Sequence, residues 1–231
     1  MVDAVRLLST LALQGALIPL AGQFEAASGI RIDADFAPTV GLLPRLRDGE
    51  AADLVILTRE GLDELAQEGR LIADSRTDLA RSYVGLAVRA GLPHPDIATP
   101  AALRATLLTA RSVAYSRIGA SGIYFAQLIG ELGIAAEINA KAIIVASGFT
   151  AERLVSGEAD LAIQQISELK QVGGIEVVGP IPLELQTPGL FSAGIMANAR
   201  RPGEAGRLLR FLASSEVAPV LRETGLVPYG I

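Results

Sequence analysis

Short apolar segments of the strand type alternate with amphipathic segments of the helix type along almost the whole chain of 231 residues. Residues 4–8, 30–36 and 53–57 have the composition of buried strands, and residues 15–28 and 60–68 have the pattern of helices. Such alternation is typical of mostly parallel sheets that are covered by helices on both faces. The sequence therefore predicts an α/β fold.

The alternation continues to the C-terminal end, and no linker, repeat or low-complexity segment interrupts it. If the chain forms two lobes, it must therefore pass between them through ordered strands, and residues 83–89 and 186–195 are the expected crossings. The other predicted strands are 112–115, 141–145, 160–164, 175–178 and 190–196, and the other predicted helices are 41–47, 99–108, 122–132, 150–156, 202–213 and 215–222.

Composition excludes several classes of function. The chain has no cysteine and one histidine, His94, so disulfides, thiol catalysis and a zinc site are not expected. A net charge of −5 with interspersed acidic and basic residues argues against nucleic acid as a partner. No phosphate-binding or dinucleotide-binding fingerprint is present, so no cofactor is expected. No apolar segment predicts membrane insertion.

Small and hydroxylated residues follow the predicted strands. In parallel sheets, ligands bind beyond the carboxyl ends of the strands. Five such segments follow the predicted strands, and four of them precede a predicted helix. The free N–H groups and the positive dipole end at the start of a helix favour an anion. Each hydroxyl alone is also explained as a helix N-cap. Together they predict an anion site made of Ser9-Thr10, Pro38-Thr39, residues 116–122, residues 147–150 and Gln164-Gln165.

Several of these segments occur in the order and spacing of a known family. Leu-Ser-Thr-Leu-Ala, Phe-Ala-Pro-Thr-Val-Gly and Ala-Asp-Leu-Val-Ile-Leu stand in the first third of the chain, and Gly-Ala-Ser-Gly-Ile-Tyr-Phe-Ala and Leu-Val-Ser-Gly-Glu-Ala-Asp-Leu-Ala-Ile follow later. Together with residues 205–226 they resemble the molybdate-binding branch of the periplasmic solute-binding proteins, over essentially the whole chain.

This resemblance implies the type II periplasmic-binding-protein fold, with residues 1–83 and 189–231 as lobe 1 and residues 84–188 as lobe 2. It also implies that an oxyanion is held in an interlobe cleft by neutral hydroxyls and backbone N–H groups, and that the lobes close on it. The positions that match the family's ligand contacts are Ser9, Thr10, Thr39, Ala120, Ser121, Phe149, Thr150 and Gln165.

Two positions depart from the family pattern. Gln165 stands where the family usually has a ligand-contacting tyrosine, and Arg117 lies in a loop where the family commonly has prolines. A fixed guanidinium suits a carboxylate, so Arg117 in the site would indicate a small organic acid as the ligand. The alternative for Arg117 is a solvated loop charge. Arg59 is a second possible cation, with an exposed helix charge as its alternative.

The function expected from these features is the capture of a small anion, either an oxyanion such as molybdate or a small carboxylate, for uptake by an ABC transporter. The partners are then the anion and a transporter permease, and the protein is expected to be a monomer. The N-terminus lacks the features of a secretory signal, so the location is periplasmic if a leader has been removed and cytoplasmic otherwise.

An isomerase acting on a tricarboxylate is the alternative, because proteins that resemble this family include aconitate isomerase. Such an enzyme needs a general base. Candidate bases are Tyr115, Glu168 and Glu184, with packing in a strand as the alternative for Tyr115 and a surface position for the two glutamates. No residue is assigned as catalytic from the sequence. A leaderless cytoplasmic ligand sensor is a further alternative.

Overall fold

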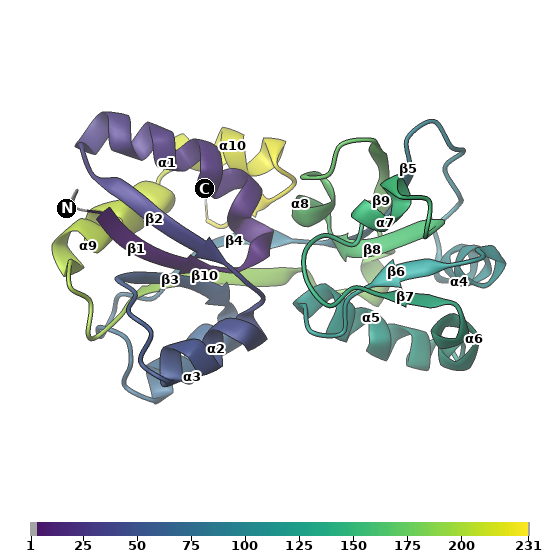
Figure 1. Ribbon diagram of the computed structural model, residues 1–231, viewed down its shortest axis with the longest axis horizontal. Coiled ribbons are helices and arrows are strands. Elements are labelled where there is room, and N and C mark those ends of the chain that lie inside the picture. The colour runs from purple at the N-terminus through teal and green to yellow at the C-terminus, as the bar shows by residue number, and fades with distance from the viewer. Residues whose placement is uncertain (1–3, 231) are drawn as a thin grey trace. The chain divides into compact units, whose positions relative to one another are not determined.

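A computed structural model describes residues 4–230, and the chain divides into two compact units. Unit 1 is formed by the residues up to Ser82 together with those from Gly189 onward, and unit 2 by Tyr83–Pro188 (Figure 1). The chain thus passes between the units twice. The first passage falls one residue before the boundary that the sequence suggests at residue 83.

The described part of unit 1 contains a six-stranded sheet with the strand order β11-β4-β10-β3-β1-β2. β1 is parallel to both β2 and β3, whereas β10 is antiparallel to both β3 and β4. The elements are β1 (Ala4–Ser9), η1 (Leu11–Leu13), α1 (Gln14–Ser28), β2 (Arg31–Phe36), α2 (Thr39–Arg47), β3 (Leu54–Thr58), α3 (Arg59–Gln67), β4 (Thr77–Ser82), β10 (Gly189–Ile195), α9 (Pro202–Leu212), η3 (Ser215–Val217), α10 (Ala218–Glu223) and β11 (Val227–Pro228).

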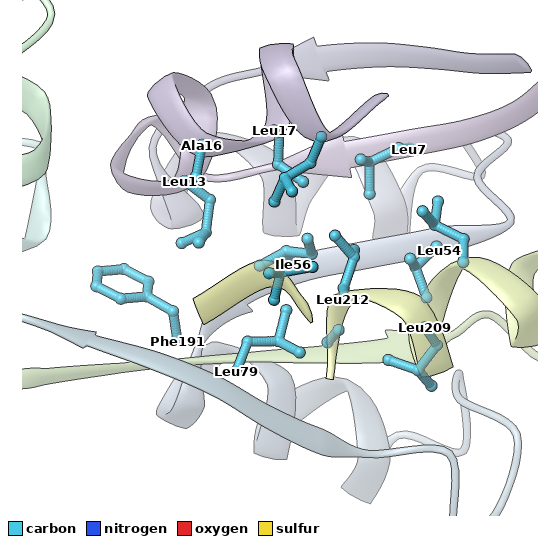
Figure 2. Close-up of a cluster of buried hydrophobic side chains, with 14 of the residues drawn as sticks. Leu7, Leu13, Ala16, Leu17, Leu54, Ile56, Leu79, Phe191, Leu209 and Leu212 are labelled. Carbon is cyan, nitrogen blue, oxygen red and sulfur yellow. The ribbon is translucent and has the colours of Figure 1, made fainter. Parts of the chain in front are cut away.

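Both faces of the central strands are buried, because helices cover each face and successive strand residues point to opposite faces. Leu7 and Ile56 pack on one face with side chains from α1 and α9, as Figure 2 shows. Leu8 and Val55 pack on the other face with side chains from α2 and α3. The central strands therefore read as continuous apolar runs, which is the signal that the sequence carries.

The described part of unit 2 contains a five-stranded sheet with the order β7-β6-β8-β5-β9. β6 is parallel to both of its neighbours, and β5 is antiparallel to both of its own. The elements are β5 (Val84–Arg89), α4 (Pro100–Thr109), β6 (Val113–Tyr115), α5 (Ala120–Glu131), α6 (Ala135–Ala140), β7 (Ala142–Ile144), α7 (Glu152–Val155), β8 (Leu161–Gln165), α8 (Ile166–Leu169), β9 (Ile175–Pro180) and η2 (Leu183–Leu185).

The two faces of the unit 2 sheet differ in the size of their side chains. One face presents large residues such as Leu86, Tyr115 and Ile163, which pack with side chains of α4, α5 and α6. The other face presents Ala87 and Ala114 together with residues of the four-residue helices α7 and α8. Small strand residues allow these short helices to approach the sheet closely.

The predicted α/β class is confirmed, but each sheet is mixed rather than mostly parallel. The strands that enter from the other unit cause the difference. Val84 begins β5 opposite Gln165, the last residue of β8, and Phe191 near the start of β10 pairs with Thr58, the last residue of β3. Each entering strand therefore begins where the parallel strands end, and it runs antiparallel to them.

Several elements differ from the sequence prediction in detail. β4 is not predicted because it carries polar residues, and α6, α8, β11 and the 3-10 turns η1 and η2 are not predicted because each has six residues or fewer. The predicted helix 215–222 is divided into η3 and α10, since Pro219 stands in the first turn of α10 and has no N–H to continue a helix. Within residues 4–230, no helix combines the length and apolar character that crossing a membrane requires.

Candidate functional site

The donor groups of unit 1 follow three adjacent parallel strands, β2, β1 and β3, whose carboxyl ends lie at one edge of the sheet. Ser9 ends β1, Thr39 begins α2 after β2, and Thr58 ends β3. The Thr58 N–H donates to Thr39 Oγ1 over 3.1 Å, which ties two of these segments together. The structure thus brings Ser9, Thr10 and Thr39 to one edge of unit 1.

Close packing of α2 and α3 fixes Thr39. A Cβ atom added at Gly61 would lie 2.5 Å from Thr39 Cγ2 and 3.4 Å from Thr58 Oγ1. Only glycine leaves room for this approach. Thr39 Oγ1 accepts from the Thr58 amide, so its own proton remains available for an acceptor such as an anion. Gly61 is a supporting residue that sequence reasoning missed, because nothing in the local pattern marks a contact between two helices.

Thr10 provides a second donor in unit 1. Its residue is only 5% exposed, yet its hydroxyl makes no hydrogen bond to any of residues 4–230. Its backbone N–H is used, since it donates to Ile56 O over 2.9 Å. The neighbouring Ser9 hydroxyl donates to Thr10 O over 3.1 Å, so Ser9 supports the turn. Solvent reaches the Thr10 hydroxyl oxygen, because Arg59 Nε is the one buried side-chain polar atom without a partner within residues 4–230, so this hydroxyl can donate to a ligand.

In unit 2 the corresponding edge is formed by β7, β6 and β8, which are also adjacent and parallel. Ser116 follows β6, and its Oγ accepts the N–H groups of Ile118 and Gly119 over 3.2 and 3.3 Å. A Cβ at Gly122 would lie 1.6 Å from Ser116 O, so glycine is required where the loop folds onto the start of α5. The loop therefore has a fixed shape.

Ala120 and Ser121 begin α5. The helix uses Gly119 O to accept from Gly122 N and Ile123 N, so the amides of Ala120 and Ser121 lie ahead of its first hydrogen bonds. Ser121 is 3% exposed, and its hydroxyl has no partner within residues 4–230. Ala120 and Ser121 thus offer two N–H groups and a hydroxyl at the positive end of a twelve-residue helix.

The loop after β7 contributes differently from the prediction. Thr150 is completely buried, and its N–H and Oγ1 lie 2.8 and 3.0 Å from Gln164 Oε1. Its donors are therefore used within the unit, and Thr150 supports the loop instead of offering a hydrogen bond. The adjacent Phe149 is half-buried, and its carbonyl accepts from Glu152 N.

Gln165, which stands at the predicted tyrosine position, is the N-cap of α8. Its side chain accepts from the Glu168 amide while Glu168 Oε2 accepts from Gln165 N over 3.3 Å, which is a capping box. The capping box places Gln165 at the start of α8.

The two candidate cations differ in their partners. Arg59 Nη1 lies 2.6 Å from Asp78 Oδ2, so a carboxylate already neutralises it. Arg117 is exposed in the loop after β6, and its Nη2 donates over 3.3 Å to Asn139 Oδ1, which is a neutral acceptor. The unit 2 edge thus carries one charged donor beside its hydroxyls and amides.

The three candidate bases have three different environments. Tyr115 is buried against Phe125 and its hydroxyl donates to Asn139 Oδ1 over 2.7 Å, as expected of a packed strand residue. Glu184 is exposed. Glu168 is buried, so the alternative of a surface charge is wrong for it. The sequence gives no signal for this burial, because it depends on how α8 packs against β5, β8 and β9.

His94 lies away from these groups. It is exposed, and its Nε2 is 2.8 Å from Glu176 Oε2. Among residues 4–230, no group of three or more histidine, aspartate or glutamate side chains is arranged to hold a metal ion.

The family model for bacterial extracellular solute-binding proteins matches residues 5–227. The chain is 36% identical to a protein named aconitate isomerase from a Pseudomonas species, over 98% of this chain and 88% of that protein.

Solved structures show the same fold at lower identity. The periplasmic molybdate-binding protein of Azotobacter vinelandii has a TM-score of 0.82 and 18% identity, with 96% of this chain and 98% of that chain covered. The sulfate-binding protein of Mycobacterium tuberculosis has a TM-score of 0.75 and 18% identity, with 99% and 88% covered. The fold is thus that of the two-lobed periplasmic binding proteins. The chain belongs to the bacterial extracellular solute-binding protein family.

Proposed function

We propose that this protein binds a small tricarboxylate and interconverts its cis and trans isomers, as an isomerase of the aconitate type. The observation that carries the proposal is the 36% identity to aconitate isomerase along 98% of the chain. The match extends over both units, so it includes every segment to which the donor groups belong.

The donor groups support this function chemically. The hydroxyls of Thr10, Thr39 and Ser121 and the amides at the start of α5 can each donate to a carboxylate oxygen. When a proton leaves a carbon next to the double bond of such a substrate, negative charge spreads onto the carboxylates. Fixed donors at those oxygens stabilise this charge without rearrangement.

The direct test is to incubate the protein with cis-aconitate and to follow the trans isomer by proton NMR. We expect conversion in both directions, to the same final ratio from either isomer. The matched variant is Thr10→Val, which keeps the shape of the side chain and removes the hydroxyl. We expect it to weaken binding and slow conversion. Binding of citrate or aconitate without conversion by the unaltered protein would contradict the proposal.

Capture of an anion for ABC-type uptake is a second candidate, which membership of the solute-binding family favours. In this case the ligand is released unchanged to a permease. Thermal unfolding with molybdate, sulfate, citrate and each aconitate isomer separates the ligands, because a ligand at 100 times its Kd adds about 2.7 kcal/mol to the stability. Stabilisation by molybdate or sulfate but not by the carboxylates would favour this second function.

A further inference from the structure

Glu168 is a buried carboxyl group in α8, the short helix that follows β8 directly, and the capping box with Gln165 uses one of its two oxygens. We propose that the Glu168 carboxyl takes up and returns the proton in the isomerisation, an inference that rests on the proposed function. Its support comes from the needs of the reaction, from the position of Glu168 in unit 2 and from its surroundings.

The reaction is a proton shift along three carbon atoms. In aconitate a methylene group stands next to a carbon–carbon double bond. A carboxylate takes one proton from the methylene, and the electron pair of that C–H bond forms a new double bond to the central carbon. The electron pair of the former double bond then takes the proton back from the carboxyl group at the other carbon. The new double bond can have either geometry, and no oxidant, reductant or cofactor is consumed.

The position of Glu168 suits this role. β7, β6 and β8 are parallel neighbours, so the segments that follow them lie at one edge of the unit 2 sheet. Glu168 comes three residues after the end of β8. The side chain of Gln164 hydrogen-bonds Glu168 and also accepts from Thr150 N and Oγ1. The carboxyl is thus one amide group away from the loop that follows β7.

The surroundings of Glu168 leave its carboxyl able to exchange a proton. The residue is 7% exposed, and its hydrogen bonds come from Gln165 N, over 3.3 Å, and from the Gln164 side chain. An ionised carboxylate has about four acceptor positions, so two donors do not saturate it. No charged side chain contributes to its ionisation. A purely structural buried carboxylate normally has more donors or a cation.

Burial raises the pKa of the Glu168 carboxyl from its ordinary 4.5 to about 7, although both hydrogen bonds act in the opposite direction. A general base works best when its pKa is near the operating pH. Of the charged residues on the packed elements, Arg89 of β5 and Glu176 of β9 lie at the far ends of their strands from Val84. Lys170, just after α8, is exposed.

The test compares Glu168→Gln and Glu168→Asp with the unaltered protein and with Glu137→Gln, a matched control at an exposed position of α6 in the same unit. Three quantities are measured: conversion of cis-aconitate, incorporation of deuterium from D₂O into aconitate, and the Kd of citrate by calorimetry. We expect Glu168→Gln to lower both conversion and deuterium incorporation by about 10²–10⁴-fold. The citrate Kd should change less than threefold.

Glu168→Asp retains an acid–base group, so we expect it to be more active than Glu168→Gln and to keep an ionisation in its kcat–pH profile. Conversion by Glu168→Gln within tenfold of the unaltered protein would overturn the inference and leave the isomerase function standing. Parallel losses of citrate affinity and turnover would also overturn it, because Glu168 would then position other groups. An unaltered protein that binds citrate but neither converts aconitate nor exchanges deuterium would reject the isomerase function itself.

Discussion

Asp53 in unit 1 and Glu168 in unit 2 are both buried carboxyl groups, 4% and 7% exposed, but their surroundings are opposite. Asp53 accepts three backbone N–H groups, from Arg6, Arg200 and Arg201, over 2.8–2.9 Å. It joins β1 to the segment before α9. Glu168 has one backbone donor at 3.3 Å and one side-chain amide.

Burial alone does not show the role of a carboxyl group. The number of donors decides whether the negative charge is stabilised in the folded protein. Asp53 has the donor set of a structural anchor, whereas the donors of Glu168 leave its ionised form costly. A buried carboxyl whose ionised form costs free energy is expected where a residue serves function and not stability.

The largest effect is expected from Asp53→Ala. This change leaves three partly buried backbone N–H groups without their acceptor, and each costs about 1 kcal/mol, the lower end for a buried donor. We expect a loss of about 3 kcal/mol in the free energy of unfolding, measured by urea denaturation. Asp53→Asn keeps one acceptor oxygen and should lose less. Equal stability of Asp53→Ala and the unaltered protein would remove the anchor role.

Glu168→Gln is expected to raise the stability of the folded protein above neutral pH, whereas Asp53→Ala lowers it. The pKa of Glu168 is raised from 4.5 when unfolded to about 7 when folded, so the folded protein binds the proton more tightly. The stability that this preference provides is complete below pH 4.5 and is lost as the pH rises through 7. We therefore expect Glu168→Gln to be more stable than the unaltered protein at pH 8, by up to about 3 kcal/mol.

The measurement is urea denaturation of both proteins at pH 5 and pH 8. The difference should be small at pH 5, where the Glu168 carboxyl is mostly protonated in the folded protein. A constant difference at both pH values would show that Glu168 does not titrate near neutral pH. The comparison with Asp53 would then lose its physical basis.

The smallest effects are expected from substitutions of the hydroxyl donors, and they change the affinity for the ligand, not the stability of the protein. Thr39→Ala in unit 1 and Ser121→Ala in unit 2 each remove one hydroxyl donor, which is worth about 1.5–3 kcal/mol when the acceptor is charged. We expect the citrate Kd to rise by about 10–100-fold, because 1.4 kcal/mol corresponds to a factor of ten. Ser156→Ala, at an exposed serine of unit 2, is the control. An effect in only one unit would limit the site to that unit.

The sequence predicts the elements of the fold more fully than their arrangement. Apolar strands such as 53–57 and helices such as 15–28 are recognisable, because burial on both faces of a sheet leaves a continuous apolar run. The direction of β5 and β10 is not recognisable. It depends on where the chain re-enters each sheet, and no local pattern records this position.

The candidate site follows the same division. Hydroxylated residues at strand ends predict Thr10, Thr39 and Ser121, whose hydroxyls can still donate. The sequence also points to Thr150 and Gln165, which the structure uses within unit 2. A serine, threonine or glutamine has the same composition signal whether its partner is a ligand or a neighbouring carbonyl, so only the tertiary contacts separate the two roles.

By itself, the sequence determined that this chain forms an α/β fold and that polar donors gather at the strand ends, since both follow from short-range periodicity and from the residues next to each strand. Only the tertiary contacts show that Glu168 is buried with two donors and that Asp53 accepts three backbone N–H groups. The reason is physical: the ionisation of a carboxyl depends on the solvent and donors around it, and these come from distant parts of the chain.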